Sequence, residues 1–486
     1  GDLFVVSIDR INGKGLGVGC IRAAVGPQEA VREYRLSVRY TVPGDVVQVS
    51  VIRRKRGDVE CQLEQIVTPS KDRVSPECVH FGPNESRERG CGGCSLQCFD
   101  YPAQLKAKSD RVERALTSIG VELSSIAPIR GMDNPWYYRN KMEFSFGVDE
   151  SNRLTLGLHP GGYRYEVMAL DSCVLQSEGS NRLVSQLGNW FHETGAAVYS
   201  SRSGTGFLKT LTVREGKRTG ERMIDLMTSS ATETTFEGVN VPAELVADRF
   251  QAALRKFCES LNEEITSIYW TREHVQRGTP TTRAATCLWG SSLLTETLQL
   301  PGKKSVRFEI HPHAFFQTNS LQAEVLYSEV LNLSGLLQSA GGRVLDLYCG
   351  TGTISMALAP YAEQVMGIEL NKEAVENARK NALINGFDHV SFAAGDVAKV
   401  LNAFPPEEKK FDLVIVDPPR AGLQGKALPL VSQMDCSELI YVSCNPDTLS
   451  RDLKFFMEEG WTVENICPVD MFPHTGHVEV VSHLRR

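Results

Sequence analysis

Cys444 is the residue whose type and position indicate covalent chemistry. It follows the apolar run Leu439–Ser443, which is typical of a buried strand, and it precedes Asn445-Pro446. A cysteine at the carboxyl end of such a strand can face a ligand crevice and act as a nucleophile. A buried structural thiol is the commoner fate of a cysteine taken alone. The Asn-Pro turn favours projection into the crevice.

A second reactive group, Glu479, stands near the carboxyl end of the sequence. It closes the run Gly476-His477-Val478-Glu479 and leads into a final strand. A carboxylate in this position can remove a proton from a reacting carbon. Most glutamates are solvated surface groups, so the assignment of Glu479 as a base depends on the motifs that accompany it.

Successive strand ends indicate a cofactor site. The strand Val344–Leu347 runs into Tyr348-Cys349-Gly350-Thr351-Gly352-Thr353, and glycines at such a turn let the backbone approach a ligand. The Gly-x-Gly spacing lacks the third glycine of dinucleotide enzymes and does not imply a pyrophosphate. Glu369 ends the next strand, where a carboxylate can bind ribose hydroxyls, and Asp396 follows the third. Each feature alone is an ordinary turn, but together they predict adenosine binding.

The fourth strand, Phe411–Val416, ends in Asp417-Pro418-Pro419-Arg420. Two prolines restrict φ and remove two backbone donors, which makes a stiff ledge against which a flat base could rest. A plain proline-rich loop is the weaker interpretation, because the motif stands at the same edge of the sheet as the other strand ends.

A group of cysteines forms a candidate metal site. Cys78, Cys91 and Cys94 have the spacing Cys-x12-Cys-x2-Cys, and Cys173 lies far downstream. Three close thiols and a distant fourth fit a four-cysteine iron–sulfur cluster or a structural zinc, and the spacing alone leaves both open. The alternative is that these cysteines are free thiols that bind no metal, and the Cys-Gly-Gly-Cys sequence argues against it. Cys98 is a neighbour that could substitute as a ligand.

The elements that position these groups divide the chain into three expected domains. Residues 1–72 read as short strands with turn punctuation and predict a small barrel of the oligonucleotide-binding (OB) kind. Residues 73–310 carry the cysteines, a polar helical stretch and mixed α+β segments. Residues 311–486 alternate strand and helix, which predicts a doubly wound, Rossmann-like α/β domain. The fold class is therefore α/β overall.

Composition excludes several classes of protein. At 486 residues, 42% hydrophobic and 23% charged, the chain is globular, and no apolar run has membrane-spanning length. The net charge of −7 argues mildly against nucleic-acid binding, although charge distribution matters more than the sum. Thirteen scattered cysteines fit a reducing compartment. The chain begins at Gly1 without Met, so a targeting segment could precede it; cytoplasm and organelle (chloroplast or mitochondrion) are both left open.

Five ordered motifs carry a family resemblance. The chain resembles the RNA 5-methyluridine (uracil-C5) methyltransferases, which modify transfer RNA or large-subunit ribosomal RNA, over nearly its whole length. The motifs are His313-Ala314-Phe315-Phe316-Gln317-Thr318-Asn319, Asp346-Leu347-Tyr348-Cys349-Gly350-Thr351-Gly352, Asp417-Pro418-Pro419-Arg420-Ala421-Gly422, Ser443-Cys444-Asn445-Pro446 and Gly476-His477-Val478-Glu479.

The resemblance implies roles for these positions. Cys444 matches the nucleophile that adds to C6 of uracil, and Glu479 matches the base that removes the C5 proton. The positions that match S-adenosylmethionine contacts are Gln317, Tyr348, Gly350, Thr353, Glu369, Asp396 and Asp417. The family often has Phe at Tyr348 and Asn at Thr353, and both changes are tolerable. Some members bind a [4Fe-4S] cluster through cysteines that match Cys78, Cys91, Cys94 and Cys173, which favours iron–sulfur over zinc here, and the N-terminal barrel matches the RNA-binding TRAM module.

Two other functions stay open at this stage. One is an amine-directed methyltransferase of the same fold, which needs no cysteine; Arg420, Cys444 and Glu479 count against it. The other is a non-catalytic RNA-binding protein, which the intact motifs disfavour. The expected partner is RNA with an unpaired or flipped uridine, since C6 is inaccessible inside a helix. A monomer without a membrane partner is expected.

Overall fold

The chain forms two compact units. The computed structural model describes residues 3–25, 30–55, 58–83, 89–149, 151, 153–276, 278–405 and 409–486. Unit one consists of Gly1–Glu77, Cys94–Pro135 and Gln322–Arg486, and unit two consists of Cys78–Gly93 and Trp136–Leu321. The segment 94–135, expected in the central domain, therefore groups with unit one. The three-domain division stays a prediction.

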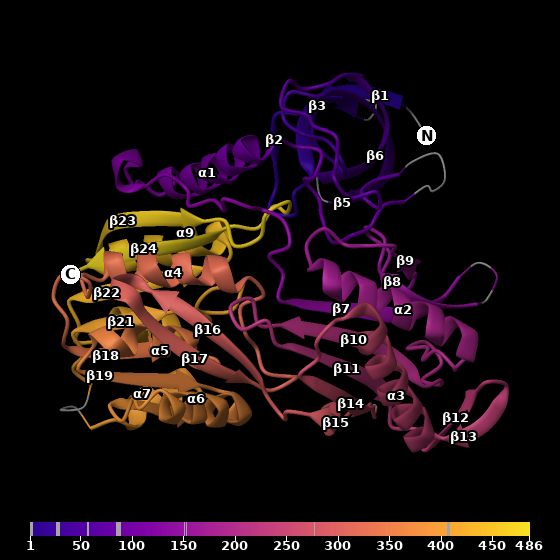
Figure 1. The fold of residues 1–486 in the computed structure, drawn as a ribbon. Coiled ribbons are helices and arrows are strands. Elements are labelled where there is room, and N and C mark those ends of the chain that lie inside the picture. Colours follow the sequence, from indigo (N-terminus) through magenta and orange to yellow (C-terminus); the bar gives the residue numbers. More distant parts are fainter. Residues whose placement is uncertain are drawn as a thin grey trace. The chain divides into compact units, whose positions relative to one another are not determined.

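The amino-terminal part of unit one is a small six-stranded barrel, drawn in indigo in Figure 1. Its strand order is β1-β5-β6-β4-β3-β2, and alternate apolar side chains such as Val38 and Val47 fill its interior. A Cβ on Gly19 would lie 2.2 Å from the Ser7 carbonyl, so glycine permits the close approach of β1 and β3 that closes the barrel. The strands are β1 (Leu3–Ser7), β2 (Arg10–Ile11), β3 (Gly17–Val25), β4 (Ala30–Val38), β5 (Val46–Lys55) and β6 (Asp58–Thr68).

The rest of unit one is a doubly wound sheet, drawn in orange to yellow in Figure 1. Its order is β20-β19-β18-β21-β22-β24-β23, parallel except for β24, which is antiparallel to both neighbours. The predicted Rossmann-like α/β architecture is thereby confirmed. The strands are β18 (Arg343–Leu347), β19 (Gln364–Glu369), β20 (Val390–Ala394), β21 (Leu413–Val416), β22 (Glu438–Ser443), β23 (Thr462–Val469) and β24 (Glu479–Arg485).

Helices of unit one pack apolar faces on this sheet. Leu116 and Phe456, for example, belong to one cluster with Val414 and Leu439 of the sheet. The described helices are α1 (Tyr101–Thr117), η1 (Leu123–Ser125), α4 (Ser320–Leu333, of which Ser320 and Leu321 belong to unit two), α5 (Thr353–Leu358), η3 (Ala359–Tyr361), α6 (Lys372–Ile384), α7 (Val397–Ala403), α8 (Ala427–Ser432) and α9 (Pro446–Glu458).

Unit two is built on a seven-stranded sheet of order β15-β14-β11-β10-β7-β8-β9. Two helices, α2 and α3, pack their apolar faces on it. The elements are β7 (Lys141–Val148), β8 (Leu154–Leu158), β9 (Met168–Ala169), α2 (Glu178–Thr194), β10 (Leu208–Glu215), β11 (Arg222–Ser229), β12 (Glu233–Phe236), β13 (Val239–Pro242), α3 (Ala243–Leu261), β14 (Ser267–His274), β15 (Thr282–Gly290), β16 (Leu294–Leu300), η2 (Pro301–Lys303) and β17 (Lys304–Ile310).

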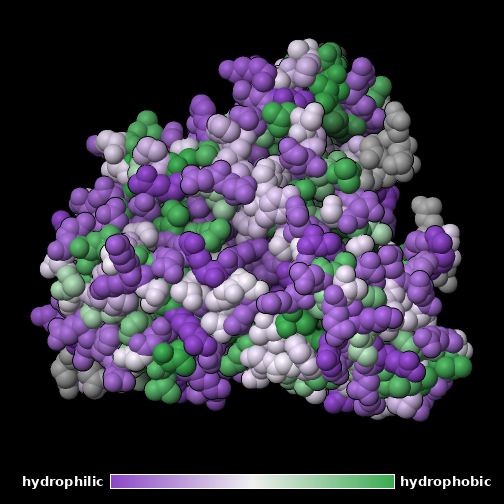
Figure 2. Space-filling view, in the orientation of Figure 1, coloured by the Kyte–Doolittle hydropathy of each residue, from purple (hydrophilic) through white to green (hydrophobic). Residues whose placement is uncertain are grey.

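The surface is mostly polar. Figure 2 shows hydrophilic and apolar side chains interspersed, with a denser apolar group over β1 and β3 of the barrel, where Leu3 and Val5 are exposed. Among the described residues, no helix combines the length and the apolar composition needed to cross a bilayer.

Candidate active site

Strand register brings Cys444 and Glu479 together. β22 and β24 pair antiparallel, with Ser443 opposite Val480. Continuing this register by one step would set Cys444 opposite Glu479, where facing residues have Cα atoms roughly 4.5–5.5 Å apart, and the Glu479 carboxylate does act electrostatically on the Cys444 thiol. Their side chains also leave the sheet on the same side. The thiol and the carboxylate therefore share one cleft. Cys444 is half-buried there, and Glu479 is buried.

The turn after Cys444 is held by the proline ledge. Asn445 caps α9 by accepting a hydrogen bond from the Asp447 amide at 3.3 Å. Its Nδ2 donates to the Arg420 carbonyl at 3.3 Å, and the Thr448 hydroxyl donates to the same carbonyl at 3.1 Å. The Asp417–Arg420 loop is thus fixed to the Cys-Asn-Pro turn. The position beside the amino end of α9 also favours the ionised form of the thiol.

The cleft is strongly acidic. Burial, reinforced by the Asp417 carboxylate, raises the pKa of Glu479 to about 8. Burial and the Asp346 carboxylate raise the pKa of Asp417 to about 7. Burial raises the pKa of Cys444 to about 11, and the carboxylates of Glu479 and Asp417 add to that rise, while the Arg420 guanidinium opposes it. Because these groups influence one another, the cleft can accept a positively charged ligand and can hold a carboxyl proton near neutral pH.

This electrostatic arrangement predicts a rising pH profile. A general base acts when ionised, so activity that needs the Glu479 carboxylate increases as the pH passes through about 8. We expect the rate at which the methylated adduct releases its product, measured in single turnover, to rise between about pH 7 and pH 9. Product release by a Glu479→Gln variant should lose that part of the pH dependence. A rate that falls across the same interval would contradict the role of Glu479 as a base.

The turn after β18 offers space for a ligand. Tyr348 and Gly350 have φ angles of 64° and 55°, and within the described part of the chain no atom apart from the two sequence neighbours lies within 4 Å of the place a Gly350 Cβ would take. The Gly350 amide donates to Glu369 Oε2 at 3.1 Å, which fixes the carboxylate at the end of β19. Gly352 has another role: a Cβ there would lie 2.9 Å from Phe392, so packing requires the glycine.

The remaining predicted cofactor residues occupy varied settings. Thr353 opens α5 and hydrogen-bonds the buried Tyr327 hydroxyl. Asp396 caps α7 by accepting from the Lys399 amide at 3.1 Å, so its carboxylate already has a structural task. Gln317 belongs to unit two, whereas the other six belong to unit one.

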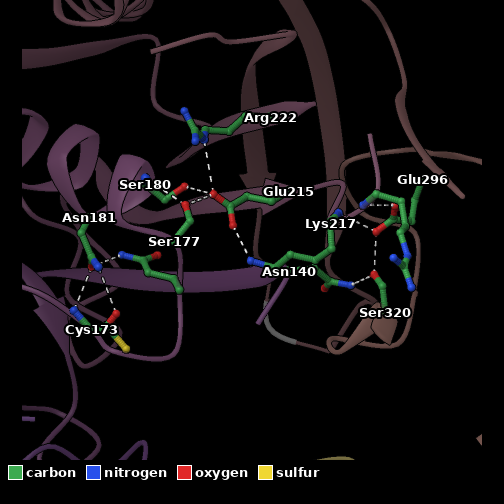
Figure 3. A network of polar contacts seen from close by, with 12 residues as sticks. Asn140, Cys173, Ser177, Ser180, Asn181, Glu215, Lys217, Arg222, Glu296 and Ser320 are labelled. Atoms are coloured by element: carbon green, nitrogen blue, oxygen red, sulfur yellow. Dashed lines mark hydrogen bonds and ion pairs between the residues drawn. The ribbon is translucent and has the colours of Figure 1, made fainter. Parts of the chain in front are cut away.

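A buried polar network fixes the backbone at Gln317 from within unit two. Figure 3 shows its members Asn140, Ser320 and Glu296. Asn140 Nδ2 donates to the Gln317 carbonyl at 2.8 Å and to Ser320 Oγ at 2.7 Å. Ser320 Oγ donates in turn to Glu296 Oε2 at 2.7 Å. The motif that contains Gln317 is therefore rigidly attached to the sheet of unit two.

The acidic strand ends fit an adenosyl sulfonium ligand. Asp346 Oδ2 accepts from the Ser355 hydroxyl at 2.5 Å, while Asp346 Oδ1 is buried without a hydrogen-bond partner. Burial raises the pKa of Asp346 to about 7. An orphaned carboxylate oxygen, open space at Gly350 and the carboxylates of Asp417 and Glu369 suit a ligand with hydroxyl donors and a positive charge.

Comparison with known proteins decides the family. A sequence profile described as tRNA (Uracil-5-)-methyltransferase matches residues 280–486. An uncharacterized RNA methyltransferase of Caldanaerobacter subterraneus is 34% identical, over 100% of this chain and 99% of that protein. The chain belongs to a family of RNA methyltransferases, and its part from residue 280 onward matches the tRNA (uracil-5-)-methyltransferase profile. The predicted enzyme class, an RNA methyltransferase, is confirmed.

Another RNA methyltransferase and one solved structure are similar over most of the chain. An uncharacterized RNA methyltransferase of Protochlamydia amoebophila is 35% identical, over 92% of this chain and 99% of that protein. The crystal structure of Pyrococcus abyssi tRNA (uracil-54, C5)-methyltransferase in complex with S-adenosyl-L-homocysteine superposes with a TM-score of 0.72 and 26% identity, covering 99% of this chain and 100% of that chain.

The polar helical stretch expected from the sequence is α1, but its contacts with the candidate site were not predicted. One face of α1 contacts the loop between β23 and β24, which ends at Glu479. Lys108 Nζ donates to Asp470 Oδ1 at 2.6 Å, and both side chains are fully buried. Gln104 Nε2 lies 3.2 Å from His474 Nδ1, and burial lowers the pKa of His474 to about 3, so this imidazole is neutral and accepts. The helical spacing of Gln104 and Lys108 was the available signal.

Further along α1, Arg111 contacts both catalytic segments. Its guanidinium donates to the Gly476 carbonyl and to Asn445 Oδ1, each at 3.4 Å, and forms an ion pair with Asp447 at 2.9 Å. Gly476 itself contacts the barrel, because a Cβ there would lie 2.2 Å from the Gly15 amide nitrogen. The loop that ends at Glu479 is thus held between α1 and the barrel.

The predicted cluster cysteines lie in both units. Cys78, Cys91 and Cys173 belong to unit two and Cys94 to unit one. Within unit two, Cys78 and Cys173 are near enough to interact electrostatically. Asn181 holds the Cys173 backbone, accepting from its amide at 2.8 Å and donating to its carbonyl at 3.0 Å (Figure 3). Searching the described ranges finds no group of three His, Cys, Asp or Glu side chains placed to hold a metal ion.

Cys98, the alternative ligand, has a different environment. Its Sγ lies 3.8 Å from the Tyr40 carbonyl of the barrel, and burial raises its pKa to about 11. These are the surroundings of a buried structural thiol.

Proposed function

We propose that this enzyme transfers a methyl group from S-adenosylmethionine to C5 of a uridine in RNA, with Cys444 as covalent nucleophile. The observation that supports the proposal best is the register of β22 and β24, which sets the thiol opposite the Glu479 carboxylate in an acidic cleft. The family membership and the five motifs agree with it. The uridine belongs to a transfer or ribosomal RNA and is unpaired or flipped out, because C6 is shielded inside a helix.

The residues of the cleft divide the chemistry between them. The Cys444 thiolate attacks C6 of uracil, and the electron pair of the C5–C6 double bond moves toward the C4 carbonyl. S-adenosylmethionine, when bound, supplies the methyl group that C5 receives. The Glu479 carboxylate then removes the C5 proton, the C5–C6 double bond forms again, and the thiolate leaves. The Arg420 guanidinium favours both ionised groups, since it lowers the pKa of each.

The methyl donor is assigned to the strand-end residues of unit one together with Gln317. The carboxylates of Glu369 and Asp417 stand where ribose hydroxyls and the sulfonium would need negative partners. Tyr348, Gly350 and Thr353 form the turn beside them, and Asp396 would hold the adenine side. We assign the barrel of residues 1–72 to RNA binding, as a TRAM module. We also propose that the enzyme is a monomer.

A mechanism-based substrate tests this function. RNA with 5-fluorouridine lacks the removable C5 proton, so the enzyme with S-adenosylmethionine should form a stable covalent complex that denaturing gels detect. With unmodified RNA, nucleoside mass spectrometry should find 5-methyluridine. Methylation of an exocyclic amine, or product formation with no trapped complex, would overturn the proposal in favour of another chemistry. RNA binding without any methylated product would point to the non-catalytic alternative.

We further propose that Cys78, Cys91, Cys94 and Cys173 hold a [4Fe-4S] cluster that organises the fold. Four thiolates leave no open coordination position, so the cluster has no chemical step to perform. The electrostatic interaction of Cys78 with Cys173 supports the assignment, as does the hydrogen bond from the Gly93 amide to Cys91 Sγ at 3.4 Å.

Removal of the ligands should remove the iron. We expect anaerobically purified protein to contain about four iron atoms per chain with a broad visible absorption band, and the Cys91→Ser/Cys94→Ser variant to lose both. Cys98→Ser is the matched control and should keep the iron. Zinc in place of iron, or iron that depends on Cys98, would contradict the assignment.

A further inference from the structure

The sheet of unit two leaves part of one face uncovered. Along β7, Met142, Phe144 and Phe146 point into the core beneath α2 and α3, whereas Glu143 between them is exposed. At one end the opposite face is covered, because the buried Arg214 donates from Nε to the Pro312 carbonyl at 3.0 Å. Beyond that segment the face is open. β7 pairs antiparallel with both of its neighbours, β8 and β10, and the solvated face of antiparallel strands usually carries polar residues and can serve as a platform.

A large hollow lies over this open face. Its volume is about 970 Å³, and strands β7 and β10 and the segments around residues 162–167 and 198–202 surround it. Side chains that line it include Ser145, His159, Tyr163, Tyr165, Arg202 and Lys209. His159 fixes one wall, since its Nε2 lies 2.9 Å from the Ser145 hydroxyl and its Nδ1 lies 2.7 Å from the Glu166 carbonyl. The hollow is therefore a built feature of the fold.

Aromatic rings and guanidinium groups alternate around the hollow. The Arg202 guanidinium lies 4.7 Å from the centre of the Tyr165 ring, and that of Arg164 lies 5.1 Å from it. Arg89 covers the ring of Tyr163 at 3.7 Å. Tyr163 and Tyr165 are 43% and 57% exposed, so part of each ring is accessible to a partner. Flat rings and planar guanidiniums are the groups on which unstacked bases stack.

Charge is available at the same place. Lys209 and Arg283 are neutralised by Glu273, at 2.5 and 3.0 Å, and Arg89 is paired with Glu166 at 2.6 Å. In contrast, within the described ranges no carboxylate forms an ion pair with Arg164 or Arg202. The two guanidiniums that stack on Tyr165 are thus the ones left to bind an anionic group such as a phosphate.

We infer that this hollow, which we call the platform groove, binds a single-stranded stretch of the RNA substrate. Bases stack on Tyr163 and Tyr165, and phosphates pair with Arg164 and Arg202. Duplex RNA does not fit this chemistry, because its bases are already stacked and its readable groove is shallow. The inference rests on the proposed function for the identity of the substrate, but the binding itself does not require catalysis.

Direct binding of a labelled, mixed-sequence 12-nucleotide RNA tests the groove. Loss of a stacking ring or of a phosphate partner should weaken binding by roughly fivefold to a hundredfold in Tyr165→Ala and Arg202→Glu. Arg202→Ala should also lower the slope of log K against log salt by about 0.7, the value for one phosphate contact to a single strand. With a complete RNA substrate, Tyr165→Ala and Arg202→Glu should raise KM and leave kcat unchanged. The contacts they remove stabilise the bound substrate and the transition state equally.

Arg255→Glu is the matched control. Arg255 stacks on Trp289 at 5.4 Å on helix α3, so the substitution removes the same kind of pair and the same charge elsewhere in unit two. It should leave RNA binding unchanged. Equal effects of Arg255→Glu and Arg202→Glu, unchanged binding in both groove variants, or equal weakening for a 12-base-pair duplex would each overturn the inference. If wild-type enzyme bound the 12-nucleotide RNA through this groove yet made no 5-methyluridine, the groove would stand and the proposed function would fail.

Discussion

Replacing Cys444 by alanine is expected to abolish both methylation and the covalent RNA complex. The alanine side chain cannot add to C6, so C5 never gains the electron density that methyl transfer requires. Removal of a covalent nucleophile lowers turnover by about 10⁴-fold or more, because the remaining groups act through it. The measurement is single-turnover methylation of RNA, with the 5-fluorouridine complex followed on denaturing gels.

Two further variants make this result interpretable. Glu479→Gln keeps the nucleophile but removes the base, so the adduct should accumulate on unmodified RNA while release slows by about 10²- to 10⁴-fold. Cys436→Ala alters another half-buried thiol, which precedes the opposite end of β22, and should keep full activity. Normal methylation by Cys444→Ala would remove the nucleophile from the mechanism and leave the cleft without its covalent step.

Replacing Lys108 by methionine is expected to cause the largest loss of stability. Lys108 and Asp470 form a fully buried ion pair, and Lys108 also donates to the Phe472 carbonyl at 3.1 Å. Methionine has a similar length but no charge, so Asp470 is left as a buried, uncompensated carboxylate. Breaking one side of a buried pair costs about 3–5 kcal/mol. Urea denaturation should show this decrease in the free energy of unfolding for the part that contains α1.

A neighbouring residue provides the control. Lys106 pairs with Asp110 one turn along α1, but at the surface, and Lys106→Met should cost less than about 0.5 kcal/mol. The double variant Lys108→Met/Asp470→Asn should recover part of the loss, because it removes the unpaired charge. A Lys108→Met protein as stable as wild type would show that the pair does not hold α1 to the loop that ends at Glu479.

The local sequence was sufficient to predict the strands and turns that carry the motifs. The runs Val344–Leu347 and Leu439–Ser443 are apolar and β-branched, and strand-to-helix turns with glycine or proline follow them, so strand identity and the position of Cys444 could be inferred. The antiparallel insertion of β24 between β22 and β23 could not be inferred, because the composition of Glu479–Arg485 does not indicate which strand it pairs with. That pairing is what sets Glu479 opposite Cys444.

Long-range contacts account for the rest of what was missed. Gln104 and Lys108 belong to a stretch predicted only as polar and helical, and both side chains are fully buried against residues more than three hundred positions away. The same limit applies to Gly476, whose need for glycine comes from Gly15 of the barrel. Periodicity describes an element and its faces, but it does not identify the partner of a polar face.

The place of β24 also affects how the protein is made. β24 lies between β22 and β23, so while the ribosome has delivered the chain only as far as β23, both of those strands lack their shared neighbour. Open strand edges pair readily with other chains. The nascent chain therefore carries two open strand edges, of β22 and β23, until β24 is delivered between them.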